Sequence, residues 1–157
     1  MKRTISTIGY EGVTIQEFVT ALQRDSVEII IDVRDVPLSR KKGFSKNQLA
    51  DSLRAHGIQY VHLKGLGDPK DGREAARAGN YPLFAKIFAK HMRSNVAKEA
   101  LDHAGMLVSD QHVCLMCFEA DYKRCHRTVV ASHLAEMTGC KVTPLAVRDY
   151  TKGRIAA

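Results

Sequence analysis

The sequence has 157 residues, of which 45% are hydrophobic and 26% charged, a composition typical of one globular domain. It excludes disordered and fibrous classes, and no apolar run approaches the roughly 20 residues that a membrane helix requires. Lysine and arginine total 24 against 17 aspartates and glutamates, and the net charge of +7 favours anionic partners such as nucleic acid. The first residues, MKRTISTIGYEG, lack the apolar core of a signal peptide, so we expect a cytoplasmic protein without membrane association.

Strands and helices alternate through the first sixty residues. TISTIGY is rich in β-formers, TIQEFVTALQR has apolar residues at helical spacing behind a Thr14 cap, and VEIIIDV is a nearly continuous β-branched run. A helix capped by Ser45, with Gly57 beyond its end, precedes another short strand. The predicted elements are strands over 4–10, 27–33 and 58–63, and helices over 14–24 and 45–57.

The polar stretch KGLGDPKDGREAARAGNYP opens the second half of the chain. Its glycines and prolines predict a long loop over 64–82, with one helical turn near 73–77, and a loop of this length is usually functional. The remaining predicted elements are a helix over 83–104 with a break near Ser94 and Asn95, a strand over 112–118, a helix over 127–139 and a strand over 141–147.

This alternation predicts a single α/β domain over 1–157, with a mostly parallel, doubly wound sheet flanked by helices. In such sheets a ligand binds beyond the carboxyl ends of the strands, at a switch point of the topology. The residues that follow the strands are therefore the first candidates for a functional site.

Two strand ends in the first half carry polar side chains. GYEG places Tyr10 and Glu11 after the first strand, and DVRDVPLSRKKGF places Asp32 and Arg34 on the same side of the second. Basic residues, a glycine and an aromatic beside a helix start suit a phosphate backbone with a stacked base. The candidate phosphate- and base-binding residues here are Arg34, Ser39, Arg40, Lys42 and Phe44.

The segment CFEADYKRCHR, after the strand at 112–118, allows three interpretations. A zinc site would use Cys114, Cys117, Cys125 and His126. We disfavour zinc because strand residues three apart face opposite sides, and because adjacent cysteine and histidine rarely bind one ion. A nucleophilic thiol would be Cys125, whose basic surroundings and following helix lower a thiol pKa, but the arginine spacing differs from the phosphatase pattern.

The third interpretation is a polar pocket, in which Glu119 acts as an acid or base while His126 and Arg127 hold an anion. We expect the four cysteines to be reduced, as is usual in the cytoplasm. All three strand ends then converge on one crevice. Its candidate catalytic residues are Tyr10, Glu11, Asp32, Glu119 and His126, its candidate anion-binding cations include Arg34, Arg40 and Arg127, and its candidate thiol is Cys125.

Four blocks, TIGYEG, DVRDVPLSR with GFS, GIQYVHLKGLGDP and CFEADYKRCHR, together resemble the DUF488 family from Thr7 to about Leu134. The resemblance implies a small α/β domain and leaves the reaction open. The matching motif positions are Tyr10, Glu11, Asp32, Arg34, Pro37, Ser39, Arg40, Glu119, Cys125, His126 and Arg127.

The leading functional hypothesis is a nucleic-acid-directed hydrolase, in the form of a DNA glycosylase that removes an altered base without a cofactor. Asp32 or Glu119 would stabilise an oxocarbenium ion or activate water, and Tyr10, Glu11 or His126 would assist the departing base. The loop over 64–82 could close over an extruded nucleotide.

Alternatives to this hypothesis stay open. A phosphodiesterase would need a metal held by Asp32 and Glu119. A noncatalytic module could bind nucleic acid or a phosphorylated nucleotide in the same crevice, with DNA expected rather than RNA. A hydrolase of a small nucleoside or phosphosugar is the third alternative.

Overall fold

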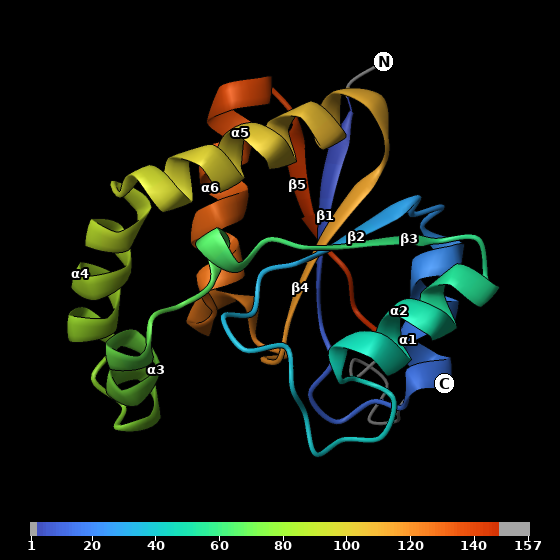
Figure 1. The fold of residues 1–157 in the computed structure, drawn as a ribbon, viewed down its shortest axis with the longest axis horizontal. Helices are drawn as coiled ribbons and strands as arrows, with labels where there is room; N and C mark the ends of the chain where they lie inside the picture. Colours follow the sequence, from blue (N-terminus) through green and yellow to red (C-terminus); the bar gives the residue numbers. More distant parts are fainter. Residues whose placement is uncertain (1–2, 148–157) are drawn as a thin grey trace.

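A computed structural model describes residues 3–147, whose centre is a five-stranded sheet (Figure 1). The strands lie in the order β3-β2-β4-β1-β5, and each neighbouring pair is parallel. Their bounds are β1 (Thr4–Gly9), β2 (Ile29–Asp32), β3 (Gln59–His62), β4 (Val113–Cys117) and β5 (Lys141–Pro144). The predicted α/β class with a parallel sheet is confirmed.

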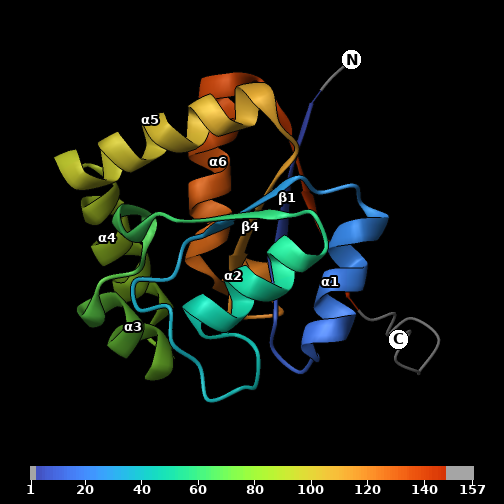
Figure 2. The same ribbon diagram turned by 45° about the vertical axis from the view of Figure 1, so that its right-hand side comes forward.

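Helices cover both faces of the sheet (Figures 1 and 2). The chain runs from β1 to β3 in one direction along the sheet and from β3 to β5 in the other. Because parallel crossovers are right-handed, this reversal puts the earlier and later helices on opposite faces. One face carries α1 (Ile15–Arg24) and α2 (Lys46–Ala55), and the other carries α3 (Lys70–Arg77), α4 (Tyr81–Met92), α5 (Asn95–Asp110) and α6 (His126–Thr138).

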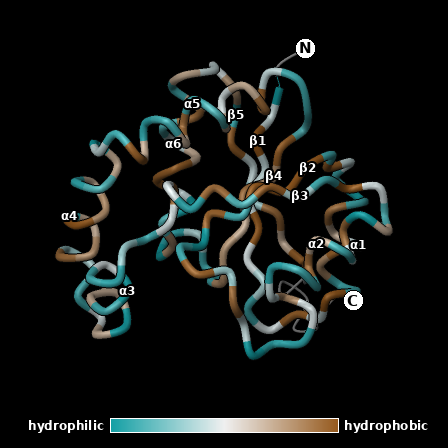
Figure 3. The backbone as a smooth tube through the Cα atoms, in the orientation of Figure 1, coloured by the Kyte–Doolittle hydropathy of each residue, from teal (hydrophilic) through white to brown (hydrophobic). Residues whose placement is uncertain are grey.

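The strands bury apolar side chains on both faces of the sheet. Ile30 and Cys114 belong to the core beneath α1 and α2, whereas Ile31 and Leu115 belong to the core on the opposite side. In Figure 3 the hydrophobic strands pass through the centre and the hydrophilic segments lie outside. Within residues 3–147, no helix is both long enough and apolar enough to cross a membrane.

A topological switch point lies between β1 and β4. The chain leaves β1 toward α1 on one face of the sheet and leaves β4 toward α6 on the other. Neighbouring strands with diverging connections leave a crevice at their carboxyl ends. The segments that follow β1, β2 and β4 therefore surround one crevice.

The predicted long loop over 64–82 is wrong. This segment folds as the 3-10 helix η1 (Lys64–Leu66), then α3, then the start of α4. The Pro69 cap of α3 makes no side-chain hydrogen bond, so the helix depends on packing: Ala75 lies in the core and α3 packs closely against α4. The segment is a packed wall of the crevice instead of a long irregular loop.

The predicted break in the helix over 83–104 is confirmed. Helix α4 ends at Met92, and the hydroxyl of Ser94 accepts a hydrogen bond from Ala97 N (3.2 Å) to start α5. Helix α5 continues to Asp110, six residues beyond the predicted end.

Candidate active site

A cleft of about 880 Å³ opens at the carboxyl edge of the sheet, between the segments after β1, β2 and β4 and the walls formed by α3 and α4. A cleft of this volume accommodates a nucleotide-sized ligand. Aromatic and apolar side chains in its lining alternate with charged groups of both signs. The charged residues of the lining are Glu11, Arg34, Asp35, Asp68, Arg73, Arg77, Glu119, Asp121 and Arg124.

Glu119 reaches the cleft through a close approach between the ends of β1 and β4. A Cβ atom at Gly9 would lie 1.8 Å from the Glu119 carbonyl oxygen, so the approach requires glycine at this position. Glu11 N donates to Phe118 O (2.8 Å), and Ala120 N donates to the Glu11 carboxylate (3.0 Å). The structure thus brings together two predicted site residues, Glu11 and Glu119.

The carboxyl group of Glu119 is partly buried in the cleft wall. Burial raises the pKa of this carboxyl, and the charge of Glu11 acts in the same direction. A backbone hydrogen bond and the charge of Arg127 oppose the shift.

Asp68 is a second cleft carboxyl and is not among the site residues predicted from the sequence. It is 6% exposed, and its Oδ1 is buried with no hydrogen-bond partner among the described residues. Burial raises the pKa of Asp68 to about 7, opposed by Arg73 and reinforced by the charges of Glu119 and Asp35. The sequence does contain one signal for Asp68. The residue lies in GLGDP, which is part of a block that resembles the DUF488 family and follows the predicted strand over 58–63.

Asp32 lies beneath the cleft, in a buried network with Arg34. It accepts hydrogen bonds from Arg34 Nη2 (2.7 Å), Arg34 Nε (2.9 Å) and Tyr60 Oη (2.5 Å), and Arg34 also donates to Tyr10 Oη (3.3 Å) and Phe44 O (2.7 Å). Burial lowers the pKa of Arg34, but the hydrogen bond and charge of Asp32 outweigh it and raise the pKa overall. Burial and the Asp32 charge also raise the pKa of Tyr60. This network fixes Arg34 and Tyr10 at the cleft floor.

The predicted base-stacking role of Phe44 is contradicted by its burial. Phe44 has no exposed surface, and its ring stacks on Tyr10 at 4.5 Å between centroids and meets the edge of Phe18 at 5.2 Å. Ser39 lines the cleft, whereas Arg40 and Lys42 are exposed outside it on the same loop.

Arg127 and His126 begin α6, and both side chains are buried. Arg127 Nη1 donates to the carbonyl oxygen of Glu119 and to Cys117 Sγ (3.1 Å), so this predicted anion-binding cation instead holds the Glu119 segment in place. Burial lowers the pKa of His126 to about 4, and its Nε2 lies 2.5 Å from Val33 O. Of the two, His126 lines the cleft.

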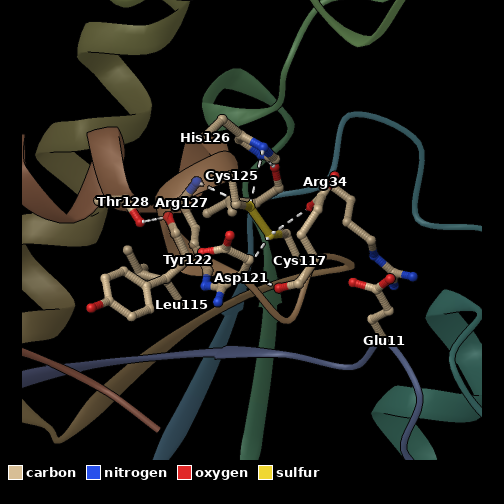
Figure 4. Close-up of a disulfide and its surroundings, with 12 residues drawn as sticks. Glu11, Arg34, Leu115, Cys117, Asp121, Tyr122, Cys125, His126, Arg127 and Thr128 are labelled. Atoms are coloured by element: carbon tan, nitrogen blue, oxygen red, sulfur yellow. Dashed lines mark hydrogen bonds between the residues drawn. A yellow bond between two sulfur atoms is a disulfide. The ribbon is translucent and has the colours of Figure 1, made fainter. Parts of the chain in front are cut away.

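Cys117 and Cys125 form a disulfide in the structure, which corrects the expectation of four reduced cysteines (Figure 4). Cys125 is therefore not a free thiol here. Cys114 and Cys140 are free, and Cys114 lies in the opposite core from Cys117, as the alternation of the strand predicts.

A family model described as "Domain of unknown function DUF488" matches residues 14–134. The chain belongs to this family. Neither a curated protein nor a solved structure matches the chain. The DUF488 match includes Asp68, Glu119 and Arg127 and begins just after Tyr10 and Glu11.

Helices α3 and α4 of this DUF488 domain contribute cleft residues that were not predicted from the sequence, because their segment was predicted to be a loop. Arg73 Nη1 bridges the Asp35 carboxylate (2.6 Å) and Asp68 O (2.8 Å), and Arg77 lies one helical turn further along the cleft. The guanidinium of Arg124 lies 5.2 Å from the ring centre of Tyr81. Arg73, Arg77 and Tyr81 thus form a cationic, aromatic wall, which Arg124 joins from the segment after β4.

Proposed function

We propose that this DUF488 protein is a hydrolase that cleaves an N-glycosidic bond in a nucleic acid, as a DNA glycosylase does. Asp68 and Glu119 form the acid–base pair of the reaction, and arginines of the cleft wall bind the phosphates flanking the reacting nucleotide. The observation that carries the proposal is the pair of carboxyl groups, Asp68 and Glu119, in one cleft at the switch point of the sheet.

The carboxyl pair supports glycosidic chemistry. Hydrolysis through an oxocarbenium-like transition state uses one carboxylic acid to protonate the leaving group and one carboxylate to stabilise the cation or activate water. The Asp68 carboxyl, with a pKa of about 7, retains a proton to donate near neutrality. We assign the acid–base role predicted for Asp32 to Asp68 instead, because the oxygens of Asp32 already accept hydrogen bonds from Arg34 and Tyr60.

The chemistry of the cleft wall supports a nucleic acid as the substrate. Arg77 and Arg124 line the cleft, and the exposed Arg40 and Lys42 extend positive charge along the neighbouring loop. Phe118 and Tyr81 line the same cleft and are 46% and 37% exposed. They therefore offer an aromatic surface on which a base can stack, whereas the buried Phe44 does not. The net charge of +7 and the expected cytoplasmic location agree with such a substrate.

End-labelled oligonucleotides, each carrying one altered base such as uracil, hypoxanthine or oxidised guanine, test the proposal. The wild-type protein should release the base from at least one of them and leave strand breaks that appear only after alkali. The Asp68→Asn and Glu119→Gln variants should lose this activity, whereas Asp71→Asn, an exposed carboxyl in α3 outside the cleft, should keep it.

Other outcomes of this assay would overturn the proposal. Breaks that form without alkali and disappear with a chelator would identify a metal-dependent phosphodiesterase. Salt-sensitive retention of the oligonucleotide without any cleavage would identify a binding module. A free nucleoside that is hydrolysed as fast as the oligonucleotide would identify a small-molecule hydrolase.

A further inference from the structure

Two sulfurs and one imidazole converge at the start of α6. The donor atoms of Cys117, Cys125 and His126 all lie within 4.8 Å of one another, and all three residues are buried (Figure 4). Cys117 ends β4, whereas Cys125 and His126 open α6, so the group is held by a strand of the central sheet and a packed helix. Cysteine and histidine are the residue types that zinc prefers.

The hydrogen bonds of His126 set its imidazole in a metal-binding orientation. Its Nε2 lies 2.5 Å from Val33 O, and because a carbonyl oxygen can only accept, Nε2 carries the hydrogen. The lone pair is then on Nδ1, which lies 3.8 Å from Cys125 Sγ. Metal-binding histidines commonly donate their second ring nitrogen to such a backbone carbonyl, which fixes the tautomer.

The surroundings of the two sulfurs suit thiolates with a cation between them. Arg127 N donates to Cys125 Sγ (3.4 Å) and Arg127 Nη1 to Cys117 Sγ (3.1 Å). Glu119 Oε2 lies 3.3 Å from Cys117 Sγ, a sulfur that has no proton to donate while it is part of a disulfide. Two thiolates, one carboxylate, a divalent cation and the Arg127 guanidinium sum to zero charge, which a buried group requires.

We propose that the reduced protein binds one zinc ion through Cys117 Sγ, Cys125 Sγ and His126 Nδ1, at the wall of the cleft. The disulfide is the oxidised, metal-free form of this site. A dithiol or phosphine reductant supplies two electrons to break the S–S bond and is itself oxidised, and the two resulting thiols release two protons to solvent when zinc binds. The fourth coordination position faces the cleft and belongs to water, because the proposed function assigns the Glu119 carboxyl to the acid–base pair.

The spacing of Cys114 and Cys117 excludes a zinc site built from all four predicted ligands. Cys114 faces the opposite core, so the Cys-x2-Cys pair cannot share an ion. The adjacency of Cys125 and His126, which also spoke against zinc, does not exclude the present site, because Cys125 Sγ and His126 Nδ1 lie 3.8 Å apart and can contact one ion. Cys125 takes the place of Cys114 because the short helix η2 (Tyr122–Arg124) returns the chain to the end of β4.

Metal titration of the untagged protein tests this inference independently of any hydrolase activity. After treatment with a phosphine reductant, Co²⁺ should produce a sulfur-to-cobalt charge-transfer absorption, and one equivalent of Zn²⁺ should abolish it. Protein oxidised to the disulfide should show no such absorption. A reduced wild-type protein without the band would overturn the inference, and this comparison needs no variant.

Serine variants identify the ligands. Cys117→Ser and Cys125→Ser should each weaken zinc binding by more than about 100-fold, since loss of a second-shell partner alone costs 10- to 100-fold. Cys114→Ser and Cys140→Ser, which change the two free thiols, should bind zinc as the wild type does. Circular dichroism checks that each variant is folded, and undiminished binding by folded Cys117→Ser or Cys125→Ser would refute the proposed ligand set.

Discussion

At the scale of single residues, the cleft depends on two kinds of buried charge. Asp68 is buried with one oxygen unpaired among the described residues, whereas Asp32 is buried with its oxygens hydrogen-bonded to Arg34 and Tyr60. An unpaired buried carboxyl destabilises the fold when it ionises, and a paired one destabilises it when its partner is removed. The two aspartates therefore give opposite predictions for stability.

Replacing Asp68 by Asn should stabilise the protein at high pH. The ordinary pKa of this carboxyl is 3.8 and the folded value is about 7, so between about pH 4 and 7 the unfolded chain loses the proton that the folded protein keeps. The free energy of unfolding of the wild type therefore falls, by up to about 4 kcal/mol, as the pH rises through this window. Asp68→Asn has no carboxyl at this position, so its free energy of unfolding should not fall in this way. Urea unfolding at pH 4 and pH 8 measures the difference.

The control for Asp68→Asn is Asp71→Asn, which removes an exposed carboxyl from the same segment. Its free energy of unfolding should follow the pH dependence of the wild type. If Asp68→Asn and the wild type gave parallel pH profiles, the raised pKa assigned to Asp68 would be wrong.

Replacing Asp32 by Asn should destabilise the protein by about 3 to 5 kcal/mol, because it leaves the buried Arg34 guanidinium without its counter-charge. The matched control is Asp51→Asn, which breaks an ion pair with Arg54 whose side chains are 76% and 75% exposed. That change should cost less than about 1 kcal/mol. Similar unfolding midpoints for the two variants would exclude the structural role given to Asp32.

At the scale of elements, the approach of β1 to the segment after β4 positions Glu119. Gly9→Ala would drive a methyl group into the Glu119 carbonyl, so the two ends must separate. We expect a loss of stability of several kcal/mol, or a folded variant in which Glu119 has moved and the activity is lost. The unfolding midpoint measures the change in stability, and the base-release assay measures the change in activity.

Gly105→Ala is the control within a helix. The nearest contact of an added Cβ in α5 is the Met137 methyl at 3.4 Å, which is ordinary packing. Alanine should stabilise this helix by about 0.5 to 1 kcal/mol. A Gly9→Ala variant as stable as Gly105→Ala would contradict the close approach.

Local sequence predicted most elements but failed where packing decides. The β-branched run of β2 and the Thr14 N-cap of α1 are local signals, and both are confirmed. Helix α3 lacks a side-chain cap and contains Gly72, so its sequence resembles a loop until it packs on α4. Phe44 follows a basic, loop-like stretch, and its burial arises from residues far away in the chain, Tyr10 and Phe18.

The site was predictable to the extent that parallel strands bring their ends together. Glu11, Arg34, Glu119 and His126 all line the cleft, as the strand-end argument predicts. Asp68, Arg73 and Arg77 belong to the segment taken for a loop, so their inward placement had no periodic signal. The pairing of Cys117 with Cys125 depends on the turn between them, whose course the sequence does not specify.

At the scale of the whole molecule, the chain has a net charge of +7, and arginines of the cleft lining lie beside carboxylates in the same cleft. The proposed function predicts that phosphates bind at the arginines of the cleft wall and along the exposed loop of Arg40 and Lys42, with the reacting sugar near Asp68 and Glu119. Affinity for single-stranded DNA should fall steeply with salt, because phosphate contacts release counterions.

Arg124→Gln should reduce the slope of log K against log salt by about 1, the change expected for one lost phosphate contact. Arg93→Gln, an exposed change at the end of α4 outside the cleft, should leave the slope unchanged. Fluorescence anisotropy with a labelled oligonucleotide measures both. Identical slopes for both variants would remove Arg124 from the binding surface.

The most direct measurement is the single-turnover rate of base release for wild type, Asp68→Asn, Glu119→Gln and the double variant. Groups that act as one unit are not additive, so the double variant should be hardly slower than the slower single variant. We expect each single change to reduce the rate by about 100-fold or more. Base release that persists in the double variant at the wild-type rate would show that the reaction occurs elsewhere.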